Sequence, residues 1–196
     1  MGDDPSDRTW RLTADGRVYR RGKQVYANRD EYDGEFLDGM RHGRGVMRFS
    51  NGDVYEGEFE LNTFHGFGMY FYQSFEDDNG ELIMGKRYEG YFRNGYRHGK
   101  GVFVLGDGDV YTGELEKGLY HGKGSLRTKN GDSYTGVFVR GKGGGQIKVV
   151  YANDDVYEGL MMSGMYEGRG KLVYARGMGW YEGEWKRGLR HGSGTR

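Results

Sequence analysis

The sequence predicts an all-β protein, an extended single-layer antiparallel solenoid of β-hairpins with almost no helix. Three observations predict it: a recurring Tyr-x-Gly-x-aromatic pattern, a single Pro, and 39 Gly beside 17 Tyr and 10 Phe. Collagen would need Gly at every third position and abundant Pro, whereas disordered chains are poor in aromatic residues. Gly combined with aromatic residues instead favours β-hairpins in which small and large side chains interlock.

A tyrosine begins each of seven units, and successive tyrosines are 23, 33, 23, 23, 23 and 24 residues apart. Residues 32–196 are therefore predicted to form seven repeats, which start at residues 32, 55, 88, 111, 134, 157 and 181. Residues 9–31 are predicted to form a degenerate lead-in hairpin, and residues 1–8 a flexible tail. The expected core of the repeat, taken from the first and fifth residues of the units, is Tyr32, Phe36, Tyr55, Phe59, Tyr88, Phe92, Tyr111, Tyr134, Phe138, Tyr157, Tyr181 and Trp185.

Each repeat has a simple physical logic. Residues two apart in a strand share a face, so Tyr32, Gly34 and Phe36 are expected on one face, where the Gly leaves room for a ring from a neighbouring strand. The acidic residues between them, such as Glu56 and Glu58 in the next unit, are expected to point to water. A second strand is expected to begin after each His-Gly-x-Gly stretch, and Asn-Gly-Asp supplies a turn with positive φ. One hairpin buries too little surface to be stable alone, so the units must stack into a rod.

Composition excludes several classes of function. Lys plus Arg equals Asp plus Glu at 29 each, so the net basic charge that nucleic-acid binding requires is absent and no nucleic-acid partner is expected. The absence of Cys excludes disulfides and Cys-based zinc sites, and it fits a reducing compartment. No apolar run approaches the roughly 18 residues of a membrane span.

The positions of the histidines do not indicate a catalytic or metal-binding role. All five occupy the same position of the repeat, which would space them roughly 10 Å apart, too far for shared metal ligation. The glycines at 143–145 indicate a loosened repeat more than a phosphate-binding loop. We therefore expect no enzyme, and no catalytic residue, metal or cofactor.

The pattern Tyr-x-Gly-x-(Trp/Phe)-x-x-Gly-x-x-His-Gly-x-Gly resembles the MORN repeat, most closely at residues 41–45, 97–101 and 190–194. The fifth unit departs from it with Gly144 for His and Ile147 for Gly, and the sixth with Glu167 for His. The resemblance implies a β-hairpin rod. MORN modules occur in ciliary radial spokes, cytoskeletal scaffolds, junctophilins, lipid kinases and a histone methyltransferase, so the resemblance indicates the fold better than the function. The lead-in at residues 24–27 and the lengthened second repeat are similar to a small MORN protein of sperm and flagella.

Three features are candidate binding surfaces. The second repeat contains an insertion at about residues 72–87, and insertions in solenoids often carry the specific contacts, although tolerated drift is the alternative. The aromatic face of a single-layer sheet would also be an exposed apolar strip. Basic residues near the His positions would form a ridge for an acidic partner such as tubulin or an anionic lipid, with alternation for solubility as the alternative. The candidate partner-binding residues are Phe75, Leu82, Ile83 and Met84 of the insertion and Arg41, Arg44, Arg97, Lys100, Lys123 and Arg190 of the ridge.

These features predict a non-catalytic structural scaffold and protein-interaction module of the cytoskeleton. Its partners would be other proteins, cytoskeletal or axonemal, and its location the cytoplasm, at the axoneme of a cilium or flagellum. One alternative is a peripheral adaptor that binds anionic phospholipids or the plasma membrane, and a second is the regulatory part of a larger enzyme. Because the last unit stops at Arg196, partway through its second strand, an open sheet edge is expected to support a homodimer.

Overall fold

The structure, a computed structural model, describes residues 10–76, 82, 83 and 85–196. The predicted tail at residues 1–8 therefore lies outside the described residues. Within them, helix is limited to a short 3-10 turn at Ala175–Gly177, and sixteen strands form one open antiparallel sheet. The all-β prediction is confirmed. The chain divides into two compact units, Met1–Arg97 and His98–Arg196, which are described in turn.

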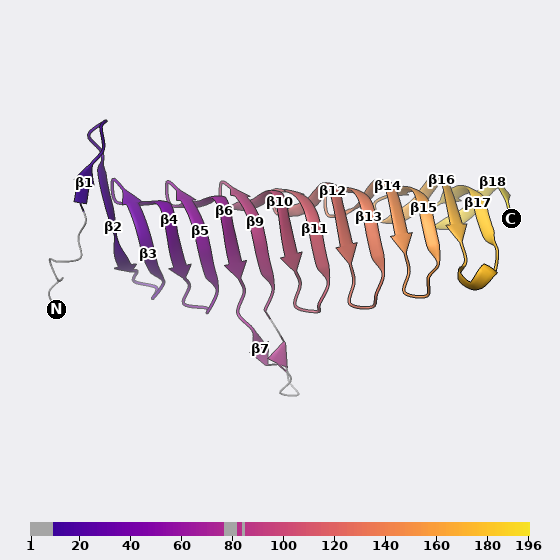
Figure 1. Cartoon of the computed structure of the whole chain (residues 1–196), viewed down its shortest axis with the longest axis horizontal. Helices are drawn as coiled ribbons and strands as arrows, with labels where there is room; N and C mark the ends of the chain where they lie inside the picture. Colours follow the sequence, from indigo (N-terminus) through magenta and orange to yellow (C-terminus); the bar gives the residue numbers. More distant parts are fainter. Residues whose placement is uncertain (1–9, 77–81, 84) are drawn as a thin grey trace. The chain divides into compact units, whose positions relative to one another are not determined.

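Strands of the first unit pair with their neighbours in sequence order, apart from one excursion (Figure 1). After β6 the chain forms a separate two-stranded sheet of β7 and β8 before it returns as β9. This excursion is the insertion of the second repeat. The strands are β1 (Trp10–Leu12), β2 (Val18–Val25), β3 (Glu31–Leu37), β4 (Met40–Arg48), β5 (Val54–Glu60), β6 (Thr63–Phe71), β7 (Phe75–Glu76), β8 (Leu82–Ile83) and β9 (Arg87–Arg93).

The second unit repeats the same hairpin without interruption, and its successive strand pairs from β10–β11 to β17–β18 are antiparallel. The boundary between the units falls inside β10, whose first two residues belong to the first unit. The strands are β10 (Tyr96–Val104), β11 (Val110–Glu116), β12 (Leu119–Arg127), β13 (Ser133–Val139), β14 (Lys142–Val150), β15 (Val156–Met162), β16 (Met165–Val173), β17 (Trp180–Lys186) and β18 (Leu189–Thr195).

The Asn-Gly-Asp turn does more than reverse the chain. Gly52 has the predicted positive φ, at 89°. Asp53 then accepts a hydrogen bond from the backbone N–H of Gln73, twenty residues later, at 2.9 Å. Because twenty residues is close to the length of a repeat, this hydrogen bond links the turn of one repeat to the turn of the next. The same bond recurs at four other turns. There the backbone N–H groups of Ser50, Lys129, Ala152 and Ala175 donate to the carboxylates of Asp30, Asp109, Asp132 and Asp155, respectively.

The second strand of each repeat does not begin after the His-Gly-x-Gly stretch, so that prediction was wrong. In the second repeat β6 begins at Thr63 and runs through His65 with a β-bulge. Gly57 pairs with Gly68 and Glu58 with His65, which leaves two extra residues of β6 inside the bulge. A bulge of this kind bends its strand and increases its local twist.

A glutamate holds the bulge, which corrects a second expectation. Glu58 was predicted to point to water, but its carboxylate accepts a hydrogen bond from the N–H of Phe67 at 3.3 Å. It also lies against Gly66, whose φ of 58° belongs to the left-handed region that glycine tolerates best. Only part of the acidic row is therefore simply solvated.

Each repeat tyrosine covers its own glycines. Tyr32 is fully buried, and its hydroxyl donates a hydrogen bond to the carbonyl of Glu35 at 2.8 Å. A Cβ added at Gly34 or at its cross-strand partner Gly45 would collide with the Tyr32 ring. The ring over Gly34 thus comes from the same strand, two residues earlier, and not from a neighbouring strand as predicted.

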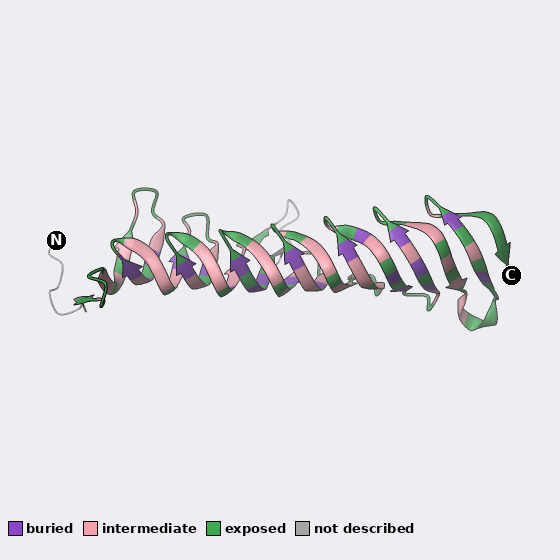
Figure 2. Cartoon of the chain, turned by 90° about the horizontal axis from the view of Figure 1, so that it is seen from above, coloured by how far each residue is buried: buried purple, intermediate pink, exposed green. Residues whose placement is uncertain are grey.

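Aromatic contacts join successive repeats. The Tyr32 ring meets the edge of Phe36 in its own repeat at 5.0 Å and of Phe59 in the next repeat at 4.9 Å. In the second unit Tyr111 meets Phe138 at 5.3 Å in the same way. Figure 2 shows the buried residues recurring along successive strands. Such edge contacts add about 0.5–1.5 kcal/mol each beyond the burial of area, so stability accumulates between neighbouring repeats.

Candidate interaction surfaces

The sheet has two faces of opposite character. The face that holds the repeat tyrosines and the aromatic residues four positions after them is called the tyrosine face. The opposite face, which holds the residues between them and their cross-strand partners, is called the charged face. Because cross-strand pairs share a face, the register assigns each candidate residue to one of the two.

The tyrosine face is not an exposed apolar strip, so that prediction was wrong. Tyr32, Tyr55, Tyr111 and Tyr157 are all 0% exposed. The reason is the bulge, which brings the residue before each His position over the repeat tyrosine. Planar side chains stack there: Phe64 on Tyr55 at 3.9 Å, Tyr120 on Tyr111 at 3.7 Å and Tyr166 on Tyr157 at 3.6 Å. Sequence reasoning missed this stacking position, although an aromatic residue or Arg precedes all five histidines.

Three of the predicted ridge residues occupy this stacking position. The guanidinium carbons of Arg41, Arg97 and Arg190 lie 6.0, 5.8 and 4.8 Å from the ring centres of the tyrosines in their own repeats, Tyr32, Tyr88 and Tyr181. A guanidinium at such distances is attracted to the ring face and covers it. These arginines therefore contribute to the packing of the tyrosine face.

The other ridge residues lie on the charged face. Arg44 pairs across the strands with Glu58, Lys100 with Glu114, and Lys123 with Val137. The prediction of one basic ridge is therefore wrong in its geometry, because its members are divided between opposite faces. Carboxylates also lie directly opposite two of the three cations. A role of these residues in partner binding stays a prediction.

The buried tyrosines offer no reactive group at neutral pH. Desolvation raises the pKa of Tyr88, Tyr111 and Tyr157 from 10.0 to about 12, so their hydroxyls stay protonated. The histidines are separated along the strands; His65 Nδ1 lies 3.0 Å from Glu60 Oε2 in a half-exposed pair. Within residues 10–76, 82, 83 and 85–196 no group of three His, Asp or Glu is placed to hold a metal, and no helix is long and apolar enough to cross a membrane.

Comparison with known families matches this geometry. The model of the MORN repeat matches six segments, residues 32–54, 55–74, 88–110, 111–133, 157–179 and 181–196, which together make up more than half of the chain. The chain belongs to the MORN repeat family. The fifth repeat, residues 134–156, lies outside the matched MORN segments.

Two other comparisons add little about function. A search of curated proteins finds no match for this MORN chain. Among solved structures, it is similar to the SAS-4 (dCPAP) TCP domain of Drosophila melanogaster, determined in complex with a proline-rich motif of Ana2 (dSTIL). The identity is 14%, the TM-score is 0.42, and the match covers 91% of this chain and 93% of that one. A TM-score of this size carries no argument about partners.

The fifth MORN repeat is packed differently from the others. Ile147 pairs with Gly136, at the position where the first repeat has Gly45 opposite Gly34. Its side chain is 4% exposed. Tyr134 is only half-buried and, within the described residues, is the one repeat tyrosine for which no hydrogen bond to the carbonyl three residues later is found. Gly143 occupies the stacking position, and a Cβ there would collide with Met161 of the next repeat. The isoleucine and methionine thus fill the space that tyrosine fills elsewhere.

The insertion of the second MORN repeat is only partly described. Phe75 is 61% exposed, and its backbone pairs with that of Ile83 in the small β7–β8 sheet. Met84 and residues 77–81 lie outside the described residues, as do the side chains of Leu82 and Ile83. The predicted role of Phe75, Leu82, Ile83 and Met84 in partner binding therefore stays a prediction.

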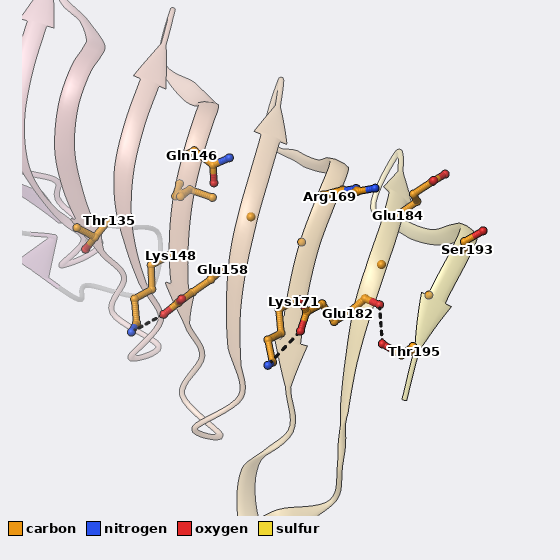
Figure 3. A pocket seen from close by; sticks show the side chains of 15 residues that line it. Thr135, Gln146, Lys148, Glu158, Arg169, Lys171, Glu182, Glu184, Ser193 and Thr195 are labelled. Carbon is orange, nitrogen blue, oxygen red and sulfur yellow. Dashed lines mark hydrogen bonds and ion pairs between the residues drawn. The ribbon is translucent and has the colours of Figure 1, made fainter.

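The charged face of the second unit is hollowed, and ion pairs neutralise its charges. Lys148 lies 2.7 Å from Glu158 and Lys171 lies 3.1 Å from Glu182, each pair linking neighbouring strands (Figure 3). These residues line an open hollow of about 820 Å³ over β13 to β18. Exposed ion pairs of this kind add little stability, but they leave no net charge on the surface.

The charged face of the first unit has a different composition. Phe67 and Tyr91, 43% and 53% exposed, meet edge to face at 5.6 Å across β6 and β9. They stand at positions that hold Arg44 and Glu58 in the preceding pair of strands. A hollow of about 500 Å³ next to them is lined by Phe67, Met69 and Glu56 among others. Sequence reasoning missed this site, although Phe67 and Tyr91 are the aromatic residues at two positions of the repeat that other units fill with charged, polar or aliphatic residues.

Proposed function

We propose that this MORN protein is a non-catalytic structural scaffold and protein-interaction module of the cytoskeleton, located at the axoneme of a cilium or flagellum. The observation that carries the proposal is the contrast between the two faces. The tyrosine face repeats one packing arrangement in all repeats but the fifth, whereas the charged face is accessible and its residues differ from repeat to repeat. A constant core with a variable surface is the arrangement of repeat proteins that bind partners.

The axonemal part of the proposal is supported by the resemblance of the lead-in and of the lengthened second repeat to a small MORN protein of sperm and flagella. The chemistry of the molecule agrees with a binding role. The core tyrosines are protonated and packed, and the acidic residues on the charged face lie on a hollowed surface rather than in a closed cleft.

The test is capture from detergent-extracted axonemes by the tagged full chain, together with imaging of the tagged protein in ciliated cells. We expect retention on the extracted axoneme and a discrete set of captured proteins. A second chain that lacks residues 75–84 measures the contribution of the insertion, whose role requires that some partners are lost. Diffuse localisation with complete release by detergent would contradict the cytoskeletal proposal.

The alternative, an adaptor for anionic phospholipids, requires a continuous basic surface. The structure instead divides the predicted ridge between two faces, with Arg41 and Arg190 over aromatic rings and Arg44 opposite Glu58. We therefore expect no flotation of the protein with vesicles that contain acidic lipids. Binding that weakens with increasing salt would favour the adaptor instead.

A further inference from the structure

One row of the charged face crosses five strands of the first unit. Its members pair in succession across β3, β4, β5, β6 and β9, so they form a continuous line. The row, here called the acidic–apolar row, consists of Asp33, Val46, Glu56, Met69 and Glu89. Carboxylates and apolar side chains thus alternate along it.

The equivalent row of the second unit alternates differently. There Lys148 and Lys171 stand at the positions of Val46 and Met69, and each forms an ion pair with the glutamate of the following strand. In the first unit no cation occupies the row beside the glutamates. Among the described residues, no ion pair or hydrogen bond is found for the side chains of Asp33, Glu56 or Glu89. Asp33 lies opposite Lys23 of β2, whose ammonium group is 2.7 Å from Glu31. Glu56 and Glu89 instead lie opposite the apolar side chains Val46 and Met69, so these two carboxylates lack the ion pairs found in the other unit.

An exposed aromatic pair adjoins this row. Phe67 lies two residues before Met69 on β6, and Tyr91 lies two residues after Glu89 on β9, so all four side chains share the charged face. The hollow of about 500 Å³ connects Phe67 with Val46, Glu56 and Met69. Arg21 and Arg44 also line it, beside the carboxylates of Asp33, Glu56 and Glu58. Exposed aromatic side chains beside a hollow are typical of the residues that dominate binding energy in protein interfaces.

We propose that the acidic–apolar row, together with Phe67 and Tyr91, binds an extended basic segment of a partner protein. The spacing specifies the segment. Alternate strands are roughly 10 Å apart, and three residues of an extended chain span about the same distance. A segment that crosses the strands would therefore present Lys or Arg to Glu56 and Glu89 three residues apart, and to Asp33 after three more. This inference rests on the proposed function and names the chemistry of one partner.

The remaining contacts fit the same occupant. The alkyl stems of Lys and Arg lie well along apolar side chains, here Val46 and Met69, while their charged ends reach the carboxylates. A further cation or an apolar side chain of the segment would pack on Phe67 and Tyr91. The unpaired carboxylates of Glu56 and Glu89 repel anionic lipid and nucleic acid, so a basic protein segment is the complementary partner.

The test measures binding of the full chain to a fluorescent ten-residue peptide with Arg at every third position and Ser elsewhere, by fluorescence anisotropy at low salt. The decisive variant is Val46→Lys with Met69→Lys, which places in the first unit the cations found in the second. We expect at least a tenfold loss of affinity without loss of the folded circular dichroism spectrum. Affinity should also fall as salt increases.

Two controls make the result specific. Glu158→Gln with Glu182→Gln makes the same change in net charge, but in the second unit, and should leave binding unchanged. A peptide with the same composition but contiguous Arg residues should bind several-fold more weakly. Phe67→Ser with Tyr91→Ser should weaken binding several-fold, because it removes the aromatic pair and leaves every charge in place.

Three outcomes would overturn the inference: unchanged binding by the double Lys variant, equal loss in the second-unit control, or equal binding of the two peptides. Its failure is distinguishable from failure of the proposed function. If the wild-type protein is retained on axonemes while the double Lys variant is retained equally and the peptide does not bind, the scaffold proposal stands and this site is wrong.

Discussion

The fourth and fifth MORN repeats fill the same space in two ways. In the fourth, residues 111–133, the Tyr111 ring lies over Gly113 and Gly124 and is covered by Tyr120 at 3.7 Å. Its hydroxyl donates to the carbonyl of Glu114 at 2.7 Å. One large side chain, two glycines and one planar cover thus make a buried unit of the core.

In the fifth repeat, residues 134–156, different residues fill most of these positions. Ile147 replaces the second glycine, Gly143 replaces the cover, and Met161 of the following repeat fills the space at Gly143. Tyr134 is half-buried as a result. The comparison teaches that the repeat requires a filled volume at native density, which several side-chain sets supply if they change together.

The largest expected effect separates the two tyrosines. Tyr111→Ala should lower the free energy of unfolding by about 3–5 kcal/mol, since a fully buried ring leaves a cavity that its glycine neighbours cannot fill. Tyr134→Ala should cost less than half as much, because that ring is partly in water. Urea unfolding followed by circular dichroism measures both. Equal losses would show that the fifth repeat uses its tyrosine as the others do.

The next effect tests the replacement itself. Ile147→Ala should cost about 2–4 kcal/mol, because Ile147 is buried and fills the place of the tyrosine ring. Its coupling to Met161 should be visible in a double-mutant cycle with Met161→Ala, since both lie at the space beside Gly143. Additive losses would mean that the two side chains fill separate spaces.

Sequence reasoning reached the fold because periodicity and turn chemistry are local signals. The spacing of the tyrosines and the positive-φ glycine at Gly52 could be read directly, as could every predicted core residue except Tyr134, which is only half-buried. The bulge could not, because the strand continues through a His-Gly-x-Gly stretch that resembles a turn. Everything that depends on the bulge was therefore missed, including the stacking of Tyr120 and the division of the basic residues between two faces.

The candidate site was missed for a related reason. Counting charges along the chain groups Arg41 with Arg44, whereas cross-strand register separates them and places Arg44 opposite Glu58. The register also reveals what is absent from a row, such as a cation beside Glu56. Such information lies between strands and cannot be read from a single segment of sequence.

A smaller effect is expected from the glycines. Gly124→Ala should cost about 1–3 kcal/mol, because the added Cβ meets the Tyr111 ring and the close packing there leaves no room to shift. The matched control is Ser125→Thr at the next residue, which also adds one methyl group but on the charged face. It keeps the hydroxyl that is hydrogen-bonded to Thr135 and should change stability by less than about 0.5 kcal/mol. A neutral Gly124→Ala would show that the ring moves freely and that Ile147 needs no compensation.

The smallest effect should be the same in both repeats. Asp109→Ala and Asp132→Ala each remove the acceptor that holds the next turn, at Lys129 and Ala152 respectively, with bonds of 2.8 and 2.9 Å. Each should cost about 0.5–1.5 kcal/mol, the usual net contribution of one hydrogen bond. Asp132→Asn retains a side-chain oxygen and should recover most of the loss.

Hydrogen exchange at the Lys129 and Ala152 amides measures these bonds directly, because each amide becomes less protected when its acceptor is removed. Equal losses would confine the difference between the fourth and fifth repeats to the core beneath the bulge. A much larger loss for Asp132→Ala would mean instead that the fifth repeat, with its half-buried tyrosine, depends on the turn for stability that the fourth obtains from stacked rings.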